Sequence, residues 1–246
     1  VVAAAALVAG LVWLSHAPFL RIETVTVTGV RSVASSSIQT LVRQRVQGVY
    51  GYLFAKDNIL LYPQDEIAAA LAAKYPQFKV VEVQAADFST VKVTVVEREP
   101  KALWCLAPHN QAGSCYFMDE DGVVYAPAPT FSAPVYISYR GTATGKLPRQ
   151  YLSKEEFHAL SAFAGAIAQK ESPERLESVS VDGLGDVRLR FENDFTVLFS
   201  LNEEGGDIFE RYVLARTAEP FAGRPLSDFE YLDLRFGDKL YYKERQ

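Results

Sequence analysis

The sequence has few of the residue types on which metal and redox sites depend. It contains two cysteines, one methionine and three histidines in 246 residues. His16, His109 and His158 do not show the short ligand spacing of a zinc site. The chain also lacks the glycine-rich phosphate-binding loops and the Gly-x-Ser-x-Gly turn of serine hydrolases. These absences predict a protein that is not an enzyme and uses no metal, cofactor or small-molecule substrate, with a catalytic site dispersed along the chain as the alternative.

Basic residues are also not concentrated at any one place in the chain. The formal net charge is −5, and lysine and arginine form no continuous stripe. A nucleic-acid-binding domain normally carries a basic footprint, so we expect no nucleic-acid partner. The hydrophobic content of 49% and the charged content of 22% are typical of folded globular protein.

Long hydrophobic runs are limited to the beginning of the chain. Residues 1–14 carry no charge and no strongly polar group, and they do not begin with methionine. As a helix they would span roughly 21 Å, less than the ~30 Å of a bilayer core. We expect residues 1–20 to be a truncated transmembrane helix and its exit. The alternatives are a secretory signal cleaved near Ala17 and a helix buried in a core.

The two cysteines, Cys105 and Cys115, are separated by nine residues. Two ligands are too few for a structural zinc site, which needs four. In an oxidising compartment such a pair favours a disulfide across a hairpin. Two free thiols and a metal site remain the alternatives.

Residues 21–99 show the periodicities of a small α+β domain. Alternation predicts strands over 22–28, 79–85 and 90–98. Between the first two strands, a serine-capped helix over 35–46 and a second helix beginning at Pro63 are expected. This β-α-α-β-β order places two helices on one face of a three-stranded sheet.

Residues 100–246 are richer in short strands, and we expect a mostly antiparallel β domain with one long helix. The long helix is expected over 152–169, with Ser153 as its cap and acidic residues in its first turn. A short amphipathic helix is expected over 207–215. Asp119 to Gly122 has a superficial likeness to a calcium loop, but a tight β-turn is the better interpretation. The expected strands cover 102–106, 114–118, 123–126, 176–181, 186–191, 195–201, 231–236 and 240–243.

Several motifs resemble a known family. The run from Val91 to Val96, followed by Glu97-Arg98-x-Pro100-x-Ala102, is similar to the end of a POTRA domain. Together with the later motifs, it resembles the bacterial cell-division family FtsQ, also called DivIB. The later motifs are Ala102-Leu103-Trp104, Phe117-Met118-Asp119-x-Asp121-Gly122 and Tyr231-x-Asp233-Leu234-Arg235-Phe236. The chain would then hold a POTRA domain over 21–99 and an FtsQ-type β domain over 100–246.

The resemblance implies a function, a location and a binding surface. A member of this family is a non-catalytic divisome scaffold of the bacterial cytoplasmic membrane, single-pass, with most of its chain outside the cytoplasm and located at the division septum. It binds FtsB- and FtsL-like division proteins and helps control septal peptidoglycan synthesis. The partner adds a strand to the end of the β domain, where an edge strand offers free backbone groups. The resemblance assigns partner binding to Asp233, Arg235, Phe236, Leu240, Tyr241 and Tyr242.

Two other functions compete with this hypothesis. A POTRA-containing envelope assembly factor or periplasmic chaperone would normally carry several POTRA repeats, and the sequence shows no internal repeat. A membrane-anchored hydrolase would need a nucleophile and a base that the motifs do not supply. Core packing is an alternative role for the alternating residues Leu232, Leu234 and Phe236.

Overall fold

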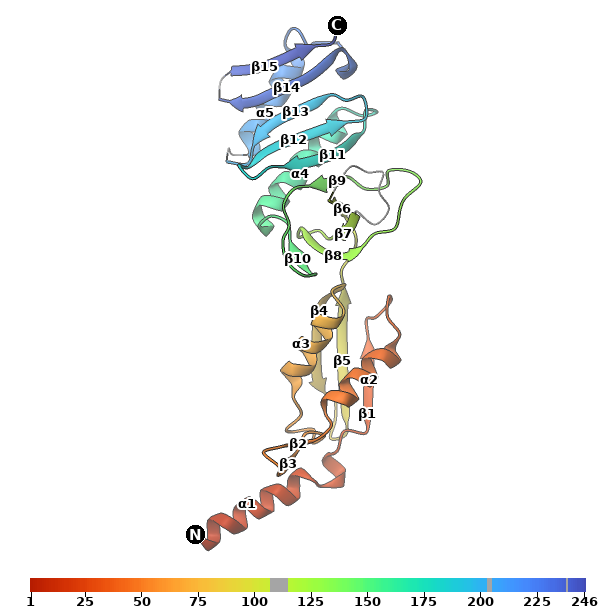
Figure 1. Cartoon of the computed structure of the whole chain (residues 1–246), viewed down its shortest axis with the longest axis vertical. Helices are drawn as coiled ribbons and strands as arrows, with labels where there is room; N and C mark the ends of the chain where they lie inside the picture. Colours follow the sequence, from red (N-terminus) through yellow and green to blue (C-terminus); the bar gives the residue numbers. More distant parts are fainter. Residues whose placement is uncertain (107–114, 203–204, 238) are drawn as a thin grey trace. The chain divides into compact units, whose positions relative to one another are not determined.

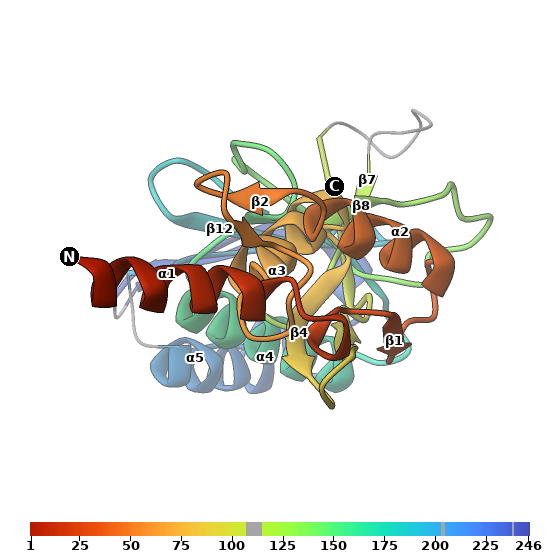
Figure 2. The same cartoon turned by 90° about the horizontal axis from the view of Figure 1, so that it is seen from below.

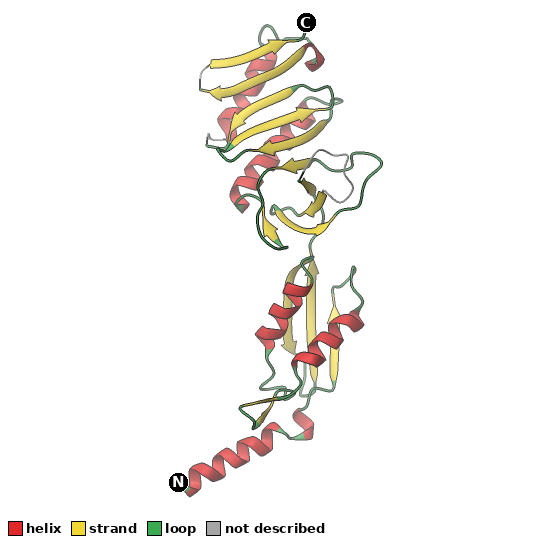
Figure 3. Cartoon of the chain, in the orientation of Figure 1, coloured by secondary structure: helices red, strands yellow, loops and turns green. Residues whose placement is uncertain are grey.

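The computed structural model describes residues 1–106, 115–202, 205–237 and 239–246 (Figure 1). The chain divides into two compact units, Val1–Arg98 and Glu99–Gln246, each with its own hydrophobic core. Both units combine helices and sheet, so the fold is α+β (Figure 3). The loop expected between the cysteines, with His109, lies outside the described residues.

The first unit is a three-stranded sheet with two helices, preceded by a helix at the start of the chain. The sheet has the order β1-β5-β4, with β1 parallel and β4 antiparallel to the central strand. A two-stranded hairpin, β2-β3, is an element that the sequence analysis missed. The elements are α1 (Val2–Ser15), η1 (Pro18–Leu20), β1 (Thr24–Thr28), α2 (Ser35–Arg45), β2 (Val49–Tyr50), β3 (Phe54–Ala55), α3 (Gln64–Lys74), β4 (Phe78–Ala85) and β5 (Thr90–Glu97).

The prediction of a transmembrane helix over 1–20 is wrong. The helix α1 has fourteen residues, fewer than the ~20 that cross a bilayer. Throughout the described residues, every helix is too short or too polar to reach across a membrane. The expected location therefore lacks support as well. It placed the chain as a single-pass protein in the bacterial cytoplasmic membrane, at the division septum. The alternative of a helix buried in a core also fails, because the apolar residues of α1 are not buried and Ser15 is.

The Glu97-Arg98 motif contacts two connecting segments of the first unit, one after β1 and one before β4. Glu97 Oε1 accepts hydrogen bonds from Arg31 N (2.9 Å), Ser32 N (3.0 Å) and Ser32 Oγ (2.9 Å). Arg98 binds the segment before β4, because its backbone N donates to Gln77 O and its Nε to Pro76 O. Burial raises the pKa of Glu97, but the hydrogen bonds from Ser32 and Arg31 outweigh it, so the pKa lies below its ordinary value.

The second unit is built on one ten-stranded mixed sheet. Its order is β10-β8-β7-β6-β9-β11-β12-β13-β14-β15, with parallel pairs at β6-β9, β9-β11 and β13-β14. The strands of its first half are β6 (Ala102–Cys105), β7 (Cys115–Met118), β8 (Val123–Pro127), β9 (Ser138–Arg140) and β10 (Arg149–Gln150). Those of its second half are β11 (Leu176–Val181), β12 (Asp186–Phe191), β13 (Thr196–Ser200), β14 (Phe229–Phe236) and β15 (Lys239–Glu244).

Two helices, α4 (Lys154–Lys170) and α5 (Gly205–Thr217), cover one face of this sheet, and among the described residues no helix lies on the other face (Figure 3). A short 3-10 turn, η2 (Leu226–Asp228), leads into β14. Figure 2 shows α4 and α5 beside one another. Phe163 of α4 contacts Phe209 of α5, and Leu160 and Tyr212 are buried between helices and sheet.

The helix starts follow local chemistry. Ser153 caps α4 as expected, because its hydroxyl accepts from Glu156 N while Glu156 Oε2 accepts from Ser153 N. The expected serine cap of α2 is wrong, since that helix begins at Ser35 and its N-cap is Ala34. The β-turn expected after Asp119 is confirmed, because the Asp119 carboxylate accepts from two backbone N–H groups of the turn.

Candidate functional site

The strand β15 forms one outer edge of the ten-stranded sheet (Figure 1). It pairs with β14 on one side, and on its other side no strand of the described chain follows. All six of its residues, Lys239–Glu244, are exposed. An edge strand in this position presents a row of hydrogen-bonding groups to a second polypeptide.

The backbone alternation identifies which groups of β15 face outward. Arg245 N donates to Asp228 O across the β14-β15 ladder. Each of the two register shifts between β14 and β15 places an extra residue in β14, so the alternation along β15 is not interrupted. The backbone groups of Tyr241 and Lys243 therefore face β14, whereas those of Leu240, Tyr242 and Glu244 face away from it.

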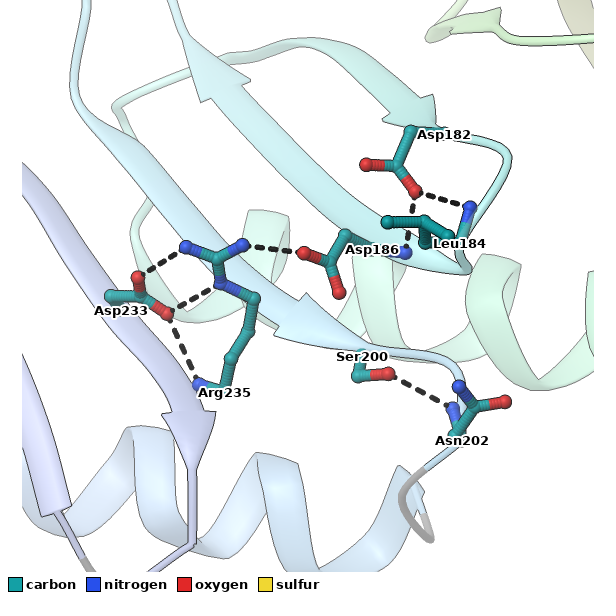
Figure 4. A network of polar contacts seen from close by, with 7 residues as sticks. All are labelled: Asp182, Leu184, Asp186, Ser200, Asn202, Asp233 and Arg235. Carbon is teal, nitrogen blue, oxygen red and sulfur yellow. Dashed lines mark hydrogen bonds and ion pairs between the residues drawn. The ribbon is translucent and has the colours of Figure 1, made fainter.

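The end of β14 is held by an arginine between two carboxylates (Figure 4). The Arg235 guanidinium donates Nε to Asp233 Oδ1 (2.9 Å) and Nη2 to Asp233 Oδ2 (2.7 Å), and Nη1 pairs with Asp186 Oδ2. The Asp233 residue is buried. Burial raises the pKa of Asp233, but the hydrogen bonds and the charge of Arg235 lower it by more. The pKa of Asp233 therefore lies below its ordinary value. Asp186 starts β12, so the network ties β14 to a strand two positions away.

The six residues that the resemblance assigned to partner binding therefore divide into two groups. Asp233 and Arg235 are engaged with each other and with Asp186, so they hold β14, the neighbour of the edge strand, and do not reach past the edge. Exposed large side chains at the same edge are Phe236 (53%), Leu240 (43%), Tyr241 (49%) and Tyr242 (43%).

The exposed rings lie on opposite faces of the sheet. Tyr242 is opposite Leu232, which belongs to the core under the helices, and its ring lies 5.5 Å from the ring of Phe221. Tyr241 is opposite Asp233, and its ring meets the ring of Phe236 edge to face at 5.2 Å. Directly opposite residues share a face, so Tyr242 borders the helix-covered face and Tyr241 the helix-free face.

A hollow of about 330 Å³ lies near this edge and includes residues that the sequence analysis missed. Leu198 and Tyr231 contribute apolar surface to it, and Arg188 and Arg245 contribute cations. Arg188 is exposed, and among the residues described it makes no ion pair. In the sequence, the alternation of Arg188 with Val187 and Leu189 indicates that Arg188 faces away from the core. It does not indicate that Arg188 lies near residues of β14.

The other sheet edges are shorter or are partly capped by side chains. The opposite edge of the ten-stranded sheet, β10, has two residues. In the first unit, Gln39 Nε2 donates to Val25 O on β1 (3.0 Å), and the Tyr62 hydroxyl is hydrogen-bonded to the backbone of Ala85 at the end of β4. Side-chain caps of this kind reduce the capacity of an edge to accept another strand.

The cysteine pair lies in a different part of the second unit. Cys105 and Cys115 face each other across β6 and β7 and form a disulfide, with their Cα atoms 4.1 Å apart. Cys105 belongs to a small core with Leu103 and Ala128. The disulfide therefore closes the two strands at the end where they leave the described residues.

A second hollow, of about 560 Å³, lies beside residues 128–136. Its charged groups pair with one another, since Arg190 contacts both Glu177 and Asp194. Within the residues described, no three potential metal ligands gather at one place. Because Arg190 is engaged by two carboxylates in this hollow, β15 is the better candidate site.

No protein-family model matches the chain, and no curated protein matches it.

Proposed function

We propose that the chain is a non-catalytic scaffold that binds another protein by strand addition at β15. The observation that carries this proposal is the outward-facing backbone of Leu240, Tyr242 and Glu244 on an edge strand whose residues are all exposed. Added strands gain affinity from main-chain hydrogen bonds and specificity from alternate side chains.

The rigidity of the edge supports the same proposal. Arg235 fixes β14 through Asp233 and Asp186, and Arg211 Nη2 donates to Leu234 O from the helix side. Because β15 is paired with β14, a fixed β14 limits the conformational entropy that β15 loses when a partner binds.

The division partners come from the family resemblance. We infer that FtsB- or FtsL-like division proteins supply the added strand, and that through them the chain helps to control septal peptidoglycan synthesis. The motif Tyr231-x-Asp233-Leu234-Arg235-Phe236, on which much of the resemblance rests, forms β14 and lies directly beside the proposed docking strand.

A proline in the edge strand tests the proposal. Leu240→Pro removes an N–H group that faces away from β14, so the fold keeps its own hydrogen bonds while an added strand loses one. We expect the affinity for an FtsB-like partner from the same organism to fall at least tenfold in a calorimetric titration.

Leu240→Ala is the matched control, because it removes the same side chain and keeps the N–H group. Circular dichroism should show both variants folded. Equal binding by the proline and alanine variants would overturn strand addition at β15. Tyr242 is a less specific probe, since its ring also packs near Phe221 and Phe229.

A further inference from the structure

We propose that the strand that docks on β15 belongs to a different protein and has two chemically distinct faces. Apolar side chains lie on its helix-side face, and carboxylates lie on the face that has no helix. This inference rests on the proposed function, because it specifies the partner of the same edge.

The helix-side face of the added strand meets apolar surface. Leu240, Tyr242 and Glu244 alternate on this side. The ring of Tyr242 lies near the buried rings of Phe221 and Phe229, and the Glu244 carboxylate is paired with Arg224 at 2.7 Å. Alternate residues of an added strand would lie directly beside Leu240 and Tyr242, within cross-strand contact distance. Aliphatic or aromatic residues there would cover both exposed side chains, whereas polar residues would leave that apolar area without a partner.

The other face of the added strand meets cations. Lys239, Tyr241 and Lys243 alternate along this side of β15. Lys239 has no ion-pair partner among the described residues, and Lys243 Nζ contacts Glu230 Oε2 at 2.8 Å. Carboxylates on the added strand would form opposite-charge cross-strand pairs with these groups.

A second copy of the chain fits this edge poorly. In an antiparallel pair, outward-facing residues must lie opposite outward-facing residues. One complete register sets Lys239 opposite Lys243 of the second copy. The other sets Lys239 opposite Arg245 and Leu240 opposite Glu244. Each register repeats its like-charge contact by symmetry, and such contacts are destabilising.

Three blocked nine-residue peptides test the inference on the full chain. One alternates isoleucine with glutamate, the second alternates isoleucine with lysine, and the third alternates serine with glutamate. We expect the first to bind about tenfold more tightly than either of the others in fluorescence anisotropy at low salt. Equal affinities would overturn the two-faced partner, and so would failure of all three peptides to bind.

Two variants separate this inference from the proposed function. Lys239→Glu should reduce the preference for the glutamate peptide over the lysine peptide at least threefold, because it reverses one cation at an exposed position. Leu240→Pro should abolish binding of the glutamate peptide. If Leu240→Pro binds normally, strand addition itself is wrong; if only the charge preference fails, the docking edge stands and the partner chemistry is wrong. A dimer of the unmodified chain in analytical ultracentrifugation, lost in Leu240→Pro, would assign the edge to a second copy and overturn the inference.

Discussion

Single residues hold the proposed docking edge in place, and Arg235 is the clearest example. Replacing it by methionine leaves the Asp233 carboxylate buried and without its bidentate partner. Because removing one member of a buried ion pair exposes the cost of desolvating the other, we expect a loss of about 2–4 kcal/mol in the free energy of unfolding. Urea denaturation measures this loss.

The double variant Asp233→Asn with Arg235→Met serves as the control. It removes the uncompensated charge, so it should recover part of the lost stability. If the single and double variants are equally unstable, the ion pair does not account for the effect.

Glu97 provides a pH-dependent contribution to stability in the first unit. Its pKa is lower in the folded chain than its ordinary value, so its contribution is present above the pKa of the unfolded chain and is lost as the pH falls through the folded pKa. We expect Glu97→Ala to cost about 1–2 kcal/mol at pH 7 and progressively less in acid.

Thermal unfolding of the two proteins between pH 7 and pH 3 checks this expectation. The difference between them should shrink with falling pH. A constant difference would show that side-chain packing, rather than the charged hydrogen bonds to Ser32 and Arg31, explains the loss.

At the scale of secondary-structure elements, alternation and capping were sufficient for the regular parts. The strands Leu176–Val181 and Asp186–Phe191 have the expected bounds. In the second strand the apolar residues alternate without interruption, whereas in the first the alternation shifts after Leu176, where the pairing with β12 is irregular. The strands β9 and β10 were missed, since two or three residues carry no measurable period. Residues Asp233 and Arg235 were found as a motif, but the pairing of Arg235 with Asp186 could not be predicted because the two residues are 49 positions apart in the sequence.

The disulfide acts on the β6-β7 hairpin. A cross-link that closes a loop of about ten residues is expected to stabilise the folded state by about 2–3 kcal/mol through the unfolded chain. Reduction should therefore lower the melting temperature of the second unit. Cys105→Ala with Cys115→Ala should show the same decrease and should not respond to reductant; a response in that variant would point to another cause.

At the scale of the whole molecule, the two units have separate cores, and the proposed docking edge lies entirely in the second. We expect a fragment of residues 99–246 to fold alone and to bind the glutamate peptide with unchanged affinity, since unit Glu99–Gln246 contains β14, β15 and the complete core beneath them. Circular dichroism and the anisotropy titration test both statements. A folded fragment that does not bind would show that the first unit contributes to the site.

Sequence patterns were least informative at this scale. The parallel pairs β6-β9, β9-β11 and β13-β14 join segments whose contacts no local period specifies. They merge three groups of antiparallel strands and the single strand β9 into one sheet. The position of β15 at the end of that sheet follows from those pairs, so its exposed edge could be expected only through the family resemblance.

The alternation of Lys239 and Lys243 along β15 also bears on how the purified protein behaves in solution. In an antiparallel pairing of two copies along β15, repulsion between these ammonium groups would oppose the edge-to-edge contact, and such repulsion extends about 10 Å at 0.1 M salt but only ~3 Å at 1 M. Concentrated salt would therefore remove the protection and favour the growth of oligomers through an edge that dilute buffer keeps available for its partner.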